Sequence, residues 1–114
     1  MEKINIGLYD KNKMSKYLVL SGRDLGNQIR KYFKLDSCDN DDKKYEVIFP
    51  DNIISISTSF FLAVFGESVR KCKTKEKFEE KYSFKVNNNL KLNINDGIKD
   101  ALNDVDGLSL WVNQ

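Results

Sequence analysis

Alternating hydrophobic and polar positions predict short strands at the start of the chain. Residues 3–9 show this alternation, and the apolar run at residues 17–20 predicts a second strand. A period of two is typical of a strand with one buried face. Because only a polar turn at residues 10–13 separates the two runs, we predict that they form a hairpin.

A helical spacing of apolar residues follows the second strand. Leu25, Ile29 and Phe33 recur every fourth position within residues 22–35. This spacing predicts an amphipathic helix with one buried stripe, and Ser21 stands where its N-cap belongs.

The middle of the chain predicts a strand and then a second, more buried helix. After a polar loop at residues 36–44, the strand at residues 45–49 ends at Pro50, the only proline. The helix at residues 60–71 is apolar on most of its first half, so we expect its aromatic residues to lie in the core. Its possible N-caps are Ser57, Thr58 and Ser59.

The last third of the chain predicts one more strand and one more helix. Residues 74–80 suit a short helical turn, and residues 82–86 alternate as a strand does. Helical spacing then extends from the asparagines at residues 87–89 to about residue 104. Apolar residues alternate again over residues 108–112, which predicts a possible C-terminal strand.

The predicted order of elements is β-β-α-β-α-β-α. Strands that alternate with helices indicate an α/β fold with parallel strand pairs and covering helices. The leading hairpin would make the β-sheet mixed. Residues 1–114 contain no linker or repeat, so we predict a single domain.

Composition makes nucleic-acid binding, membrane binding, catalysis and metal binding less expected for this chain. The net charge is +2, so no broad basic surface is expected for nucleic acid or membrane binding. Histidine is absent, which removes the commonest general base and metal ligand. We therefore predict no catalytic residues, no metal and no cofactor. Cys38 and Cys72 lack metal-site spacing and are expected to be free thiols.

Location follows from the same features. The N-terminal residues are polar and charged, without the pattern of a signal peptide. The longest apolar run, residues 60–65, is too short to span a bilayer. We predict a cytoplasmic protein.

Hydroxyl groups cluster at the junction before the second long helix. Ser57, Thr58 and Ser59 stand where a helix presents unpaired N–H groups and the positive end of its dipole. A phosphate at this junction would be stabilised, so these residues are candidate phosphoacceptors. The alternative is that one of them simply caps the helix.

A second candidate surface lies on the first helix. Arg23, Gly26 and Arg30 share a helix face opposite the apolar stripe. With Ser21 and Gly22, this face suits a carboxylate or phosphate of a partner. The alternative is a solvated face with Gly26 packed on the protein's own sheet. No Gly-rich nucleotide-binding motif is present.

Three segments have a distinctive order and spacing. YEVIFPDNIISISTSFFLAVFG, residues 45–66, contains a strand, a serine-rich turn and an apolar helix. LSGRDLGNQIR, residues 20–30, starts the first predicted helix, and residues 77–102 contain the closing strand and helix. Together these segments resemble the STAS-like domain family, which is distantly similar to the STAS domains of anti-sigma factor antagonists. The resemblance implies a mixed sheet flanked by helices.

The same resemblance implies a function. The antagonists bind histidine-kinase-type ATPases and are switched by phosphorylation of a serine, whose position Thr58 occupies here. We therefore expect a non-enzymatic regulatory module that binds such an ATPase or another anti-sigma-like partner. An alternative is a small-molecule or nucleotide sensor that binds an anion at the N-terminus of the helix near Phe60.

Overall fold

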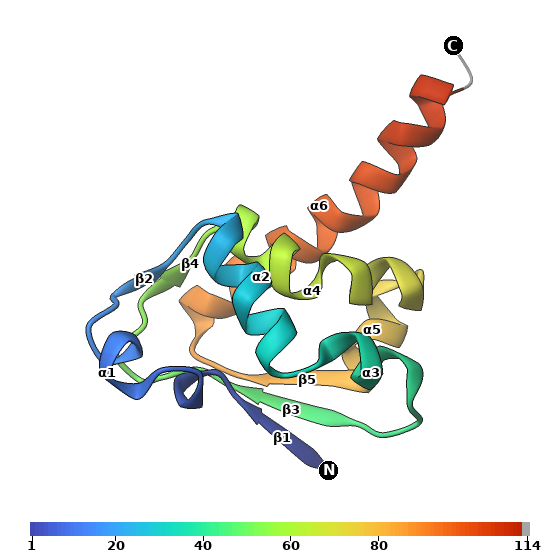
Figure 1. Cartoon of the computed structure of the whole chain (residues 1–114). Coiled ribbons are helices and arrows are strands. Elements are labelled where there is room, and N and C mark those ends of the chain that lie inside the picture. The colour runs from blue at the N-terminus through green and yellow to red at the C-terminus, as the bar shows by residue number, and fades with distance from the viewer. Residues whose placement is uncertain (113–114) are drawn as a thin grey trace.

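The fold is α/β, as predicted, and contains two small parallel sheets (Figure 1). The computed structural model describes the backbone of residues 1–112 and the side chains of residues 1–103. The larger sheet has the strand order β1-β3-β5, with bounds Glu2–Asn5, Tyr45–Ile48 and Tyr82–Lys85. The smaller sheet pairs β2 with β4, with bounds Val19–Leu20 and Ser55–Ile56.

Helices cover one face of the larger sheet, with α2 and α4 side by side above it (Figure 1). The last turns of α6 extend away from this layer (Figure 1). The helices are η1 (a 3₁₀ helix, Ile6–Leu8), α1 (Lys11–Met14), α2 (Arg23–Tyr32), α3 (Leu35–Asn40), α4 (Thr58–Cys72), α5 (Lys75–Lys81) and α6 (Asn88–Val112).

Strand register places the apolar residues of the larger sheet in rows beneath the helices. Ile4, Val47 and Phe84 are direct neighbours across the three strands. Tyr45 and Tyr82 form the next row, and their rings stack with centroids 5.6 Å apart. The period-two pattern therefore gives the sheet one buried face, as the alternation predicted.

The core is centred on α4, whose apolar residues face the sheet and both neighbouring helices. Phe60, Phe61 and Phe65 are each 1% exposed, which confirms their predicted core position. The ring of Phe65 lies 5.3 Å from that of Phe84 and 6.0 Å from that of Phe78. Burial of such aromatic side chains is the main stabilising contribution to a domain of this size.

The predicted hairpin between residues 3–9 and 17–20 is wrong. Both strands pair with later segments instead, β1 parallel to β3 and β2 parallel to β4. The connection between them forms η1 and α1, because two side chains act as helix caps. Asn5 Oδ1 accepts a hydrogen bond from the N–H of Gly7, and Asp10 Oδ1 accepts one from Lys13.

Two further predictions need correction. The helix predicted at residues 22–35 ends at Tyr32, because Lys34 adopts a left-handed conformation with φ 54° and starts α3. The predicted loop at residues 36–44 is therefore partly helical. The predicted C-terminal strand is also wrong, since α6 continues to Val112. A helix satisfies its own backbone hydrogen bonds, whereas a terminal strand needs an open sheet edge beside it.

Candidate functional site

The strands β2 and β4 end side by side, and each is followed by a helix (Figure 1). Leu20 pairs with Ile56, and the N–H of Ser57 donates to the carbonyl oxygen of Leu20 at 2.9 Å. Because these strands are parallel, α2 and α4 begin at the same end of the small sheet. We call this end the corner and define it by residues 21–23 and 57–59.

Ser57 is the N-cap of α4, which confirms one of the predicted caps. Its Oγ accepts a hydrogen bond from the N–H of Phe60 at 3.1 Å and lies 3.1 Å from Ser59 Oγ. Thr58 is the first helical residue. Ser57 and Thr58 are half-buried and Ser59 is exposed, so the hydroxyl-bearing segment lies at the surface.

The other half of the corner is built by backbone conformation. Gly22, and not Ser21 as predicted, is the N-cap of α2. Its φ of 91° is one that residues with a side chain rarely adopt. Ser21 and Arg23 are both exposed. The structure therefore brings three predicted binding residues, Ser21, Gly22 and Arg23, next to the three candidate phosphoacceptors.

Gly26 does not belong to an accessible surface, so its predicted role in partner binding is wrong. A Cβ atom at this position would lie 2.6 Å from Ala63 Cβ and 2.8 Å from the carbonyl oxygen of Phe60. The glycine is buried because α4 packs directly on α2 at this point. Another backbone does approach Gly26 closely, as expected, but that backbone belongs to α4 of the same chain.

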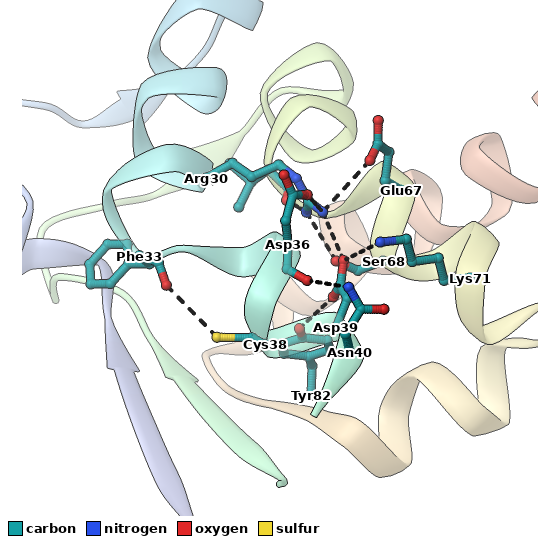
Figure 2. Close-up of polar contacts among 11 residues, drawn as sticks. Arg30, Phe33, Asp36, Cys38, Asp39, Asn40, Glu67, Ser68, Lys71 and Tyr82 are labelled. Atoms are coloured by element: carbon teal, nitrogen blue, oxygen red, sulfur yellow. Dashed lines mark hydrogen bonds and ion pairs between the residues drawn. The ribbon is translucent and has the colours of Figure 1, made fainter. Parts of the chain in front are cut away.

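Arg30 is also turned inward, and its side chain is only 11% exposed. Nη1 donates to the carbonyl oxygen of Val64 at 2.7 Å and to Ser68 Oγ at 3.1 Å. Nη2 donates to Asp36 and Asp39, both at 2.7 Å (Figure 2). The Arg30 guanidinium is therefore held by its own protein and is not the free cation that the prediction assumed.

The Arg30 cluster contains a buried carboxylate that sequence reasoning missed. Asp39 is 1% exposed and accepts a hydrogen bond from Tyr82 Oη at 2.6 Å (Figure 2). The residues of the Arg30 cluster come from α2, α3, α4 and β5, so the cluster joins four elements. The available signal was the three-residue spacing of Asp36 and Asp39, which places both on one helix face.

Electrostatics fix the protonation states of this cluster. Burial tends to lower the pKa of Arg30, but hydrogen bonds to Asp39 and Asp36 outweigh it and raise that pKa. The guanidinium lowers the pKa of Asp36. Burial and the hydrogen bond to Asp39 raise the pKa of Tyr82. A charged arginine and a neutral tyrosine, both hydrogen-bonded to Asp39, form a structural bridge between α2, α3 and β5.

Two asparagines of α6 cover the outer edge of β4. Asn89 Nδ2 donates to the carbonyl oxygen of Ile54 at 3.0 Å, and Asn93 Oδ1 accepts from the N–H of Ile56 at 2.9 Å. These side chains occupy the place of a neighbouring strand. The asparagines of residues 87–89 were interpreted only as a helix start, although the spacing of Asn89 and Asn93 puts them on one face.

Exposed apolar residues occur in and next to the small sheet and on α6. Leu18 is 59% exposed, Val19 44%, Ile54 53% and Leu92 62%. The N–H of Ile54 donates to the carbonyl oxygen of Leu18 at 2.7 Å. Leu92 lies between the two asparagines that hold β4. We call these four residues the apolar patch.

Comparisons of the chain with protein-family models, curated proteins and solved structures gave no match. Among the residues that the structure describes, no three His, Cys, Asp or Glu side chains are placed to hold a metal ion. No helix of the described part is long and apolar enough to cross a membrane. Cys38 and Cys72 are free thiols.

Proposed function

We propose that this protein is a cytoplasmic, non-enzymatic regulatory module of the STAS-like kind, which binds a protein partner at the corner and the apolar patch. The partner that best suits this proposal is a histidine-kinase-type ATPase or another anti-sigma-like protein. Neither a cofactor nor nucleic acid is required. The apolar patch, the geometry of the corner and the sequence resemblance support the proposal together.

The apolar patch is the observation that carries the proposal. Leu18, Val19, Ile54 and Leu92 are exposed large apolar residues of neighbouring segments. The backbones of Leu18 and Ile54 are hydrogen-bonded, and Asn89 of α6 donates to Ile54. Exposed apolar residues on neighbouring segments of a small domain are typical of protein interfaces. Their position next to the phosphoacceptor candidates means that a bound partner would also cover residues 57–59.

Phosphorylation near Thr58 would act as the switch. A phosphate adds about two negative charges, which the N-terminus of α4 stabilises in the unbound protein. The same charges would be desolvated when an apolar surface of the partner covers them, and this desolvation opposes binding. Modification is therefore expected to leave the fold intact and to weaken binding.

A test of the docking surface uses titration calorimetry with a purified histidine-kinase-type ATPase from the same organism. Leu92→Asp should weaken binding about tenfold or more, because it removes the burial of one leucine side chain and buries a charge. Leu8→Asp is the matched control, since Leu8 is 49% exposed on η1, outside the patch. Equal affinities for the two variants would contradict the proposed surface.

A test of the switch compares Thr58→Glu with Thr58→Gln, which differ in charge but little in size. The glutamate variant should bind more weakly than the glutamine variant, with unchanged thermal stability. Identical binding by both would exclude the switch. A melting temperature that rises with nucleotides alone would instead favour the small-molecule sensor.

A further inference from the structure

Two adjoining hollows run along the exposed side of α2. The first has a volume of about 250 Å³ and lies between α2 and α4, where Arg23, Asn27 and Glu67 contribute to its lining. The second has a volume of about 490 Å³ and extends past Lys31 to Lys34 and Asp36. Asn27 and Arg30 line both. We call these two hollows together the α2 trough.

Positive charge dominates the α2 trough once the internal ion pairs are considered. Both carboxylates of its lining lie beside Arg30, with Asp36 at 2.7 Å and Glu67 at 3.8 Å from Nη2. Arg23, Lys31 and Lys34 are exposed. Within the part of the chain whose side chains are described, these three cations make no ion pair. The lining therefore carries cations that lack a carboxylate of their own.

Size and rigidity suit a segment of chain better than a single small anion. From Arg23 to Tyr32 the axis of α2 rises about 14 Å, the length of roughly four extended residues. The floor is held in place because the Arg30 guanidinium is bonded to α3 and α4 as well. A preformed site loses little free energy to reorganisation when a ligand binds.

We infer that the α2 trough binds an acidic segment of the protein partner, an assignment that rests on the proposed regulatory function. Carboxylate side chains of the segment pair with Arg23, Lys31 and Lys34. The trough begins at the corner, because Arg23 belongs to both. A partner seated on the apolar patch can therefore extend its acidic segment along α2, and the charges set its orientation and rate of association.

The test uses an end-blocked hexaglutamate peptide as the probe and needs no natural partner. Backbone amide shifts of the ¹⁵N-labelled full chain should change saturably in residues 23–34 and 62–70. Hexaglutamine should produce no such change. Binding should weaken as salt is added, since exposed charge pairs are screened.

Two double variants supply the matched comparison. Arg23→Glu/Lys31→Glu should lower the peptide affinity about tenfold or more, because it replaces attraction with repulsion at two contacts. Lys75→Glu/Lys77→Glu makes the same change in net charge on α5, away from the trough, and should leave the affinity nearly unchanged. Equal losses in both variants, or shifts centred on α5, would overturn the assignment.

Two further experiments test whether the trough binds a peptide segment or a small anion, and whether peptide binding is independent of the proposed function. Inorganic phosphate with the affinity and shifts of the peptide would overturn the segment assignment in favour of a small-anion site. Leu92→Asp should leave peptide binding intact, because Leu92 lies outside the trough. Peptide binding without ATPase binding would therefore refute the proposed partner while supporting the trough.

Discussion

At the residue scale, the contact between α2 and α4 depends on the absence of one side chain. Gly26 lies against the backbone oxygen of Phe60 and the methyl group of Ala63. Glycine inside a helix costs about 1 kcal/mol relative to alanine, so its presence has a compensating gain. That gain is the short distance between the two helices, which places Ser57 and Gly22 at the same corner.

Gly26→Ala is expected to lower the free energy of unfolding by about 1–3 kcal/mol. The added Cβ would meet a backbone atom at 2.8 Å, which cannot move unless α4 moves, and overpacking of this kind has a cost of that size. Urea unfolding followed by circular dichroism measures the change. Asn27→Ala, at the neighbouring exposed position, should be nearly neutral, and equal effects at both positions would contradict the close approach.

Sequence reasoning at this scale identified the cap of α4 but missed the cap of α2 by one residue, and it failed for buried polar groups. Ser57 could be predicted as a cap because capping depends on neighbours in the chain. The inward turn of Arg30 could not, since its acceptors Val64 and Ser68 lie more than thirty positions away. A helix face opposite one apolar stripe was taken as exposed, but α2 packs on both the sheet and α4.

At the scale of elements, the Arg30 cluster explains why α3 has a fixed position. α3 is short and its polar residues would by themselves favour a loop. Arg30 of α2 and Tyr82 of β5 both bind Asp39, and this ties α3 to the core. An ion pair buried in this way contributes to a specific arrangement more than to net stability.

The burial of each carboxylate, and not its distance from Arg30, should decide how much it contributes to the free energy of unfolding. Asp36 and Asp39 both lie 2.7 Å from Arg30 Nη2, but their side chains are 78% and 1% exposed. Asp39→Ala should cost about 3–5 kcal/mol, because it leaves the buried guanidinium without its main partner. Asp36→Ala should cost at most about 1 kcal/mol. Thermal and urea unfolding of the pair provide the comparison, and similar losses would refute it.

Element types were predictable from the sequence, but strand partners were not. An apolar run that ends before Pro50 located β3, and alternation located β5, both almost to the residue. The hydroxyl residues 57–59 located the start of α4 within two residues. The pairing of β1 with β3 joins segments about forty residues apart, and local patterns carry no information on it. The two-residue strand β4 is too short to show alternation, so the small sheet went unrecognised.

For the whole molecule, several titrating groups lie near the start of β3 and β5. Tyr45 Oη donates a hydrogen bond to Asp41, and Lys81 Nζ lies 3.0 Å from the same carboxylate. The hydrogen bond from Tyr45 is the main cause that lowers the pKa of Asp41 from its usual 3.8 to about 2. Burial raises the pKa of Tyr45 and Tyr82 above the usual 10.0.

These pKa shifts predict that the free energy of unfolding falls at both acid and alkaline pH. The contribution of Asp41 is present above pH 3.8 and is lost as the pH falls towards about 2. The contributions of Tyr45 and Tyr82 are present below pH 10.0 and are lost as the pH rises above it. Urea midpoints measured across this range provide the check. Asp41→Asn should reduce the fall of the urea midpoint at acid pH, and Tyr82→Phe should reduce its fall at alkaline pH. An unchanged pH dependence in these variants would contradict both assignments.

The asparagine cover of β4 also bears on how the protein avoids aggregation. An uncovered strand edge is a template onto which another chain can add, and repetition of that step produces fibres. Asn89 and Asn93 occupy the donor and acceptor positions that an incoming chain would need. The small sheet can therefore not propagate on that side, even though apolar side chains stand exposed beside it.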